Sequence, residues 1–132
     1  MRNIAKTISR ARALMLGLMA AVGLAVAASA AITSNLQIEA GETFVLGGGQ
    51  ESSFTVTGRN TGPVPVEVLG KAEGVAVGVL RGTVAPGAML DATFASGEAA
   101  LLRNTSDRKT ARLKLTITGD TASLGMDYVP NP

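Results

Sequence analysis

Apolar and polar residues alternate along most of the chain after its first thirty residues. The clearest case is the segment 111–118, where Leu113, Leu115 and Ile117 are separated by single charged or hydroxyl residues. Side chains two positions apart lie on the same face of a β-strand, so this period indicates one face on the core and one in water. We therefore predict that 111–118 is a strand with these three residues buried.

Other segments have the length and composition of strands. They lie at 36–39, 44–46, 53–57, 64–68, 75–80, 89–94, 99–102 and 124–128. Pro65 favours a sheet edge or a bulge, because it has no amide proton to donate to a ladder. Since 75–80 is apolar on both faces apart from Gly78, we predict that it is a central strand or one that another segment covers.

Turn-forming residues separate these segments. The turn signals are Gly47-Gly48-Gly49, Asn60-Thr61-Gly62-Pro63, Pro86-Gly87 and the run 104–107. Such residues tolerate positive φ or fix the direction of a turn. Seven to nine short strands in about 100 residues are typical of an immunoglobulin-like antiparallel β-sandwich, and we predict this all-β fold. A small closed barrel is the alternative.

The first thirty residues have the organisation of an export signal. Four basic residues lie within 2–12, an apolar run follows at 13–27, and the small residues Ala28-Ser29-Ala30 end it. This arrangement is typical of a signal helix that a peptidase removes. We predict a signal peptide at 1–30 and a single domain at 31–132, in the periplasm, on the cell surface or secreted. A segment that stays uncut as a membrane anchor is the alternative.

Composition removes several classes of function. Four of the 12 Lys and Arg residues lie in the signal, whereas all 10 Asp and Glu residues follow it, so the mature domain has a net charge of −2. With three Phe, one Tyr and no Trp, it lacks the positive surplus and the stacking rings of nucleic-acid binders. The absence of Cys and His removes disulfides, thiol chemistry and every triad with a His base. We predict no nucleic-acid partner, and no membrane contact after signal cleavage.

The cations of the mature domain are unevenly placed. Five of its eight Lys and Arg residues lie within twelve positions, at Arg103, Arg108, Lys109, Arg112 and Lys114. Such charges keep an apolar strand from pairing with other molecules. They also form a candidate interaction patch for an acidic partner or an anionic cell-surface polymer.

The segment that follows the predicted cleavage site is a second candidate. In 34–40, the apolar residues Leu36, Ile38 and Ala40 alternate with polar neighbours. A strand of this kind ordinarily pairs within its own sheet. It can also pair with the sheet of a neighbouring subunit by strand exchange. Leu36 and Ile38 are therefore candidate exchange-strand residues.

The motifs yield no catalytic, cofactor-binding or metal-binding residue. The glycine run at 47–49 is not followed by Lys-Ser or Lys-Thr, and Asp120 and Asp127 lack a calcium-loop pattern. We predict a protein that is not an enzyme and has no cofactor. A hydrolase with a carboxylate pair is a remote alternative, because few aromatic side chains exist to line a sugar site.

Turn and strand residues between Phe54 and Phe94 recur in a known type of domain. They are Phe54, Asn60-Thr61-Gly62, Val64, Val66, Val68, Pro86-Gly87, Leu90, Ala92 and Phe94. In these features the chain resembles the immunoglobulin-like β-sandwiches of the abnormal-spindle and major-sperm-protein kind, as found in exported bacterial domains. The Cys-Gly-Cys segment that bacterial members often carry has no counterpart here. The resemblance implies a protein-binding or architectural module and supplies no catalytic residues.

The sequence thus predicts an exported, non-catalytic immunoglobulin-like module. We expect it to bind a protein partner or to serve as a structural component of the envelope or cell surface. The alternative is a self-assembling surface or fibre subunit that exchanges a strand through residues 34–40.

Overall fold

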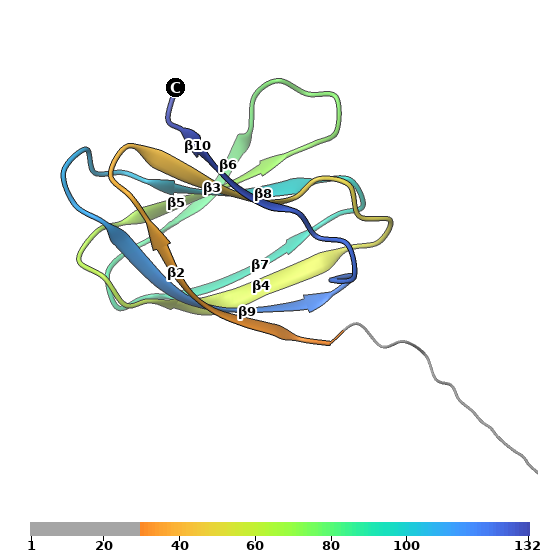
Figure 1. Ribbon diagram of the computed structural model, residues 1–132, viewed down its shortest axis with the longest axis horizontal. Helices are drawn as coiled ribbons and strands as arrows, with labels where there is room; N and C mark the ends of the chain where they lie inside the picture. The colour runs from red at the N-terminus through yellow and green to blue at the C-terminus, as the bar shows by residue number, and fades with distance from the viewer. Residues whose placement is uncertain (1–29) are drawn as a thin grey trace, which may run out of the picture.

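The computed structural model describes residues 30–132, which form nine β-strands in two antiparallel sheets (Figure 1). The predicted signal lies outside the described residues apart from Ala30. The strands are β2 (Ile32–Ile38), β3 (Glu42–Gly47), β4 (Phe54–Asn60), β5 (Val66–Lys71), β6 (Val79–Val84), β7 (Met89–Phe94), β8 (Ala99–Asn104), β9 (Ala111–Gly119) and β10 (Met126–Pro130). No helix within 30–132 is long and apolar enough to cross a membrane.

The two sheets are the layers of a β-sandwich. The five-stranded sheet has the order β10-β3-β8-β5-β6, and the four-stranded sheet has the order β2-β9-β4-β7. Every connection except the β5–β6 hairpin leads from one sheet to the other, so the chain itself ties the layers together. The prediction of an all-β sandwich is confirmed, and the alternative of one closed barrel is wrong.

The core between the sheets is aliphatic apart from three phenylalanines, Phe44, Phe54 and Phe94. Leu113, Leu115 and Ile117 of β9 are buried, as their alternation predicts. Phe54 of β4 and Phe94 of β7 lie opposite each other in the same ladder, and their rings stack with centroids 5.3 Å apart. Burial of side chains like these is the main contribution to the stability of such a domain.

The prediction for 75–80 is wrong. Residues 72–78 form the loop of the β5–β6 hairpin, and the strand begins only at Val79. That strand, β6, lies at the edge of the five-stranded sheet and is exposed over most of its length. Gly74 adopts a φ of 76° in the loop, a conformation that favours glycine and turns the chain before a strand can continue. The apolar character of this segment is therefore a property of the surface.

The expectation for Pro65 is also wrong. The strand starts after it, at Val66, and β5 lies between β8 and β6 inside its sheet. The irregularity of β5 falls between Val68 and Leu69, where its register with β6 shifts. Because Pro65 precedes the ladder, its missing amide proton costs no strand hydrogen bond.

Two buried asparagines hold the turns at one end of the sandwich. The Nδ2 group of Asn60 donates to the carbonyl oxygens of Val64 and Val84 at 2.7 and 2.9 Å. The Nδ2 group of Asn104 donates to the carbonyl oxygens of Ile38 at 2.9 Å and Lys109 at 2.7 Å. Both side chains are fully buried. These turn residues therefore act as hydrogen-bonding centres that join separate strands.

Candidate functional site

Large aliphatic side chains are exposed close together where β5 leads into β6. Val75, Val77, Val79 and Leu80 have exposed fractions of 46%, 73%, 67% and 55%. Single exposed aliphatic residues are ordinary on a protein surface, whereas a contiguous group marks an interaction site. Here four exposed aliphatic residues lie within six positions of the chain, two in the loop and two at the start of β6.

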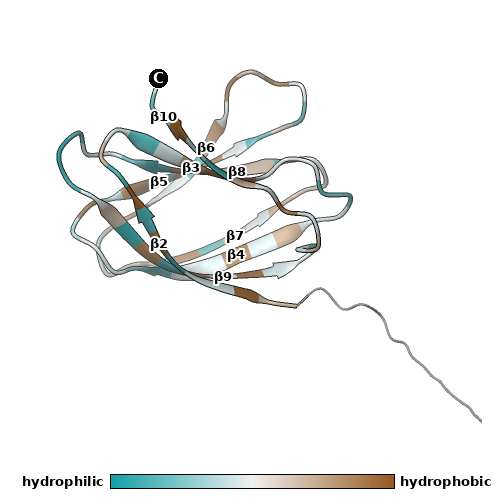
Figure 2. Cartoon of the chain, in the orientation of Figure 1, coloured by the Kyte–Doolittle hydropathy of each residue, from teal (hydrophilic) through white to brown (hydrophobic). Residues whose placement is uncertain are grey.

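The β5–β6 loop encloses a cavity of about 330 Å³ on the outer face of the five-stranded sheet. Leu69 of β5, Leu101 of β8, Val77 of the loop and Val129 of β10 line it. Val129 is itself 38% exposed, so the apolar area continues from the loop onto β10, where Figure 2 shows brown residues. We call Val75, Val77, Val79, Leu80 and Val129 the apolar surface.

Polar groups stand beside this cavity. Thr43, Lys71 and Arg103 also line it. The Arg103 guanidinium is paired with Glu67, with Nη2 and Oε1 2.6 Å apart. Lys71 has no carboxylate within 4 Å among the described residues. The cavity thus combines apolar walls with a few polar groups, as binding sites commonly do.

The structure divides the predicted basic patch among three places. Arg103 lies on β8, in the five-stranded sheet. Arg108 and Lys109 lie in the loop between β8 and β9. Arg112 and Lys114 lie on β9, at the exposed positions of the four-stranded sheet. The five cations therefore do not share one surface.

A cation that the sequence pattern did not single out joins the two on β9. Arg59 of β4 lies directly opposite Lys114 in the β4–β9 ladder, and Arg59, Arg112 and Lys114 are all exposed. None of the three has a carboxylate within 4 Å among residues 30–132. The signal that identifies Arg59 is the register of β4 on β9, and we call these three residues the basic face.

The predicted exchange strand forms part of its own sheet. Leu36 and Ile38 lie on β2 and are buried, and β2 pairs with β9 without a break from Ile32 to Ile38. The Tyr128 hydroxyl of β10 donates to the Gln37 carbonyl at 3.0 Å. Since β2 is an edge strand, this contact covers part of its free edge.

Partial burial raises the pKa of Tyr128 above its ordinary value, and the carboxylates of Glu42 and Glu39 raise it further. Both effects disfavour the tyrosinate anion, one through lost hydration and the other through charge repulsion. The hydroxyl therefore remains a hydrogen-bond donor at neutral pH.

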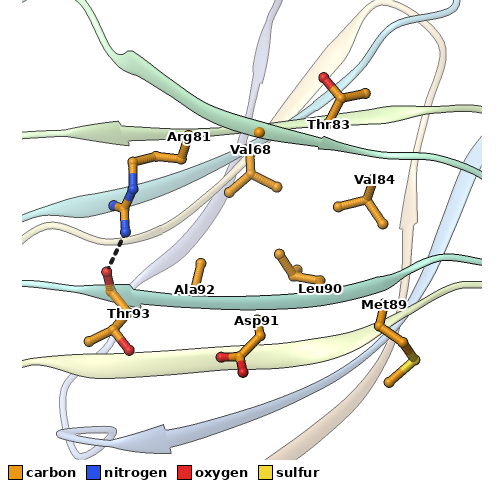
Figure 3. Close-up of a pocket in the computed structure, with 10 residues that line it drawn as sticks. Val68, Arg81, Thr83, Val84, Met89, Leu90, Asp91, Ala92 and Thr93 are labelled. Carbon is orange, nitrogen blue, oxygen red and sulfur yellow. Dashed lines mark hydrogen bonds between the residues drawn. The ribbon is translucent and has the colours of Figure 1, made fainter.

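The side of the sandwich between β6 and β7 is open, with a groove of about 500 Å³ (Figure 3). Arg81 crosses this groove, and its Nη2 donates to the Thr93 carbonyl at 2.8 Å. Its guanidinium also lies 4.9 Å from the centre of the Phe94 ring. Asp91 is the one carboxylate that lines the groove, so the pair of carboxylates that a glycosidase uses is not found there.

Metal binding has no obvious location in the described part of the chain. No group of three or more acidic side chains within residues 30–132 is placed to hold an ion. The exposed features described above are the apolar surface, at the β5–β6 loop, the start of β6 and β10, and the basic face, on the outer face of the four-stranded sheet.

Comparison with protein-family models, with curated proteins and with solved structures gives no match for this chain.

Proposed function

We propose that the protein is an exported, non-catalytic module of the immunoglobulin-like type that binds a protein partner through the apolar surface, alone or as a component of the cell envelope. The main support is the exposure of Val77, which is 73% exposed beside an apolar cavity. The same domain buries valines such as Val66 completely. A chain that can build a dry core gains nothing in its own stability from leaving these side chains in water.

The energy available at this surface fits an interaction that also uses polar contacts. Full burial of an exposed Val or Leu contributes about 1.5 to 3 kcal/mol, so these half-exposed side chains contribute roughly 1 kcal/mol each. Association costs about 4 kcal/mol or more in lost freedom. A partner must therefore also bond to polar groups at the rim of the cavity, and Lys71 is placed for this.

Export is proposed from the arrangement of residues 1–30, which has a basic start, an apolar centre and a small-residue site. The absence of Cys means that the domain needs no disulfide in an oxidising compartment. The immunoglobulin-like type is proposed from the two antiparallel layers and the connections that repeatedly cross between them.

Three forms of the mature protein test the proposed surface. They are the wild type, Val77→Asp on the apolar surface, and Thr118→Asp as a control that adds the same charge to an exposed position of the other sheet. Each is immobilised and exposed to envelope proteins of the source cell, and captured proteins are purified and rebound individually. We expect a partner that binds the wild type and Thr118→Asp with equal affinity and Val77→Asp at least tenfold more weakly. Equal binding to all three forms would contradict the proposal.

A second candidate function is self-assembly by exchange of residues 34–40. It is favoured by the position of β2, which lies at a sheet edge and pairs with β9 alone. A short connection at 39–41 leads from it to the other sheet, so β2 can leave without disrupting another ladder.

A disulfide between β2 and β9 separates the two candidates. Thr33 and Thr116 lie opposite each other in that ladder, so Thr33→Cys combined with Thr116→Cys can lock β2 in its own sheet. If exchange is the assembly mode, monomer that is oxidised before assembly stays monomeric, and a reducing agent allows it to assemble. Assemblies that form from monomer oxidised beforehand would exclude exchange of β2.

A further inference from the structure

The basic face contains a pair of like charges in direct opposition. Arg59 and Lys114 are partners in the β4–β9 ladder, and Arg112 follows two residues from Lys114 on the same face. Directly opposed residues have Cβ atoms about 4.5 to 5.5 Å apart, and like charges at this spacing are destabilising. The domain neutralises other arginines, since Arg81 and Arg103 each contact a glutamate. The basic face is left without such a partner.

The net charge of this sheet is opposite in sign to the net charge of the mature domain. The strands β2, β9, β4 and β7 carry three cations, Arg59, Arg112 and Lys114, and a single acid, Asp91. This is a net charge of +2 in a mature domain whose net charge is −2. The strands of the other sheet carry as many cations as acids, so the excess positive charge lies on the four-stranded sheet, where it creates a local positive potential that attracts anions.

The surroundings of the basic face are polar on the β2 side and include one exposed apolar residue, Met89, on the β7 side. On β2, Asn35 lies opposite Lys114 and Gln37 lies opposite Arg112. Among the exposed large apolar side chains of the described residues, only Met89 lies on these four strands, and it lies opposite Arg59 in the β4–β7 ladder. Interfaces between proteins are usually centred on buried aromatic or aliphatic anchors. This face offers charges and amides instead, which suits a hydrated ligand.

We propose that the basic face binds an extended polyanion whose hydrated backbone carries carboxylate or phosphate groups. Arginine presents a planar fork of donors that matches either group, and lysine adds a point charge. Arg59 uses one donor on the Gly87 carbonyl, at 3.1 Å, and keeps the others for a ligand. The side-chain amides of Asn35 and Gln37 are exposed and can form hydrogen bonds with hydroxyl groups on the backbone of the polyanion. This site is separate from the apolar surface and does not depend on the function proposed for it.

Binding of defined polymers to the mature protein tests this site. Polygalacturonate carries carboxylates on a sugar backbone, linear polyphosphate carries phosphates without sugar, and neutral dextran controls for the sugar alone. We expect the wild type to bind at least one of the two polyanions, more weakly as salt is added, and not to bind dextran. Comparison of the two polyanions identifies which anionic group the site accepts.

Two single variants locate the binding. Lys114→Gln removes one charge from the basic face, and Lys71→Gln removes one from the opposite sheet. We expect Lys114→Gln to weaken polyanion binding about two- to fivefold, as for one exposed ion pair, and Lys71→Gln to leave it unchanged. The triple variant Arg59→Gln, Arg112→Gln, Lys114→Gln should weaken it at least tenfold.

Thermal unfolding provides a control for damage to the fold. Because Lys114→Gln relieves a like-charge pair, its melting temperature should equal or exceed that of the wild type. The proposal would be overturned by three results: no binding of either polyanion at low salt, equal losses in Lys114→Gln and Lys71→Gln, or unchanged binding in the triple variant.

Discussion

Replacement of Asn104 by alanine should cost this domain a large share of its stability. The Asn104 side chain is fully buried at the end of β8. Its Nδ2 group donates to the carbonyl oxygens of Ile38 at 2.9 Å and Lys109 at 2.7 Å, and Glu39 O lies 3.2 Å away. Its Oδ1 atom accepts from the Ser106 amide at 2.7 Å. One side chain therefore connects the end of β2, the β8–β9 loop and β8 itself.

The magnitude follows from the bonds that would be lost. A typical hydrogen bond contributes about 0.5 to 1.5 kcal/mol net, and each buried group left without a partner costs about 1 to 3 kcal/mol. Loss of at least three bonds around Asn104 should lower the free energy of unfolding by roughly 3 to 5 kcal/mol. Small domains have about 5 to 15 kcal/mol in total. The melting temperature should fall by roughly 12 to 40 °C, at about 4 to 8 °C per kcal/mol.

Denaturant unfolding of the mature protein measures this effect. Asn104→Ala should shift the midpoint strongly with little change in the slope, since the surface exposed on unfolding is nearly the same. Asn104→Asp should be at least as damaging, because it presents a carboxylate to carbonyl oxygens that need a donor. Asn35→Ala, at an exposed position of β2, should change stability by less than about 0.5 kcal/mol. A loss of less than about 1 kcal/mol in Asn104→Ala would refute this account of the residue.

Other substitutions test the packing and the edge contacts. Leu115→Ala should leave a cavity in the buried face of β9 and cost about 2 to 5 kcal/mol by denaturant unfolding; an unchanged midpoint would show that the side chain is not in the core. Gly58→Ala should cost about 1 to 3 kcal/mol, because its added Cβ would collide with the Lys114 carbonyl oxygen. Gly125→Ala, where no heavy atom lies within 4 Å, should be neutral or stabilising, and equal losses in the two would exclude a steric cause. Tyr128 is the single tyrosine, and ultraviolet absorption should give its pKa above 10.0. Because folding favours its neutral form, this contribution to stability is present below pH 10 and is lost as the pH rises through the raised pKa. A pKa at or below 10 would contradict the effect of partial burial and of the nearby Glu42 and Glu39 carboxylates on Tyr128.

Local alternation predicts the strands whose two faces differ. In β9, Arg112 and Lys114 face water while Leu113 and Leu115 face the core, so the pattern identifies both the strand and its orientation. The turn signals work for a related reason, since residues that fix a turn act on their immediate neighbours. Asn60 and Asn104 end β4 and β8 where those signals place a break.

The local sequence pattern does not predict the burial of a segment when that burial depends on the order of strands in the assembled sheet. The run 75–80 is apolar, and its composition is the same whether it fills a core or covers a surface. Its exposure depends on β6 being the last strand of its sheet, and strand order is set by the packing of the whole domain. The apolar surface therefore emerges only once the sheets are assembled.

The basic face shows the same limit for charged residues. Closeness in sequence grouped Arg103 with Arg112 and Lys114, yet the chain crosses from one sheet to the other between β8 and β9. Arg59 is far from them in sequence and directly opposite Lys114 in the ladder. The register between strands therefore decides which cations can act together.

The central claim is that an exported, single-domain module acts by binding a partner. It is tested most directly by the intact mass and light-scattering mass of the native protein, recovered from its source cell. The account predicts a chain that begins at Ala31 and runs as a monomer outside the cytoplasm. A chain that retains residues 1–30 in the cytoplasm would contradict export, and regular high-order assemblies would replace the binding module with a self-assembling subunit.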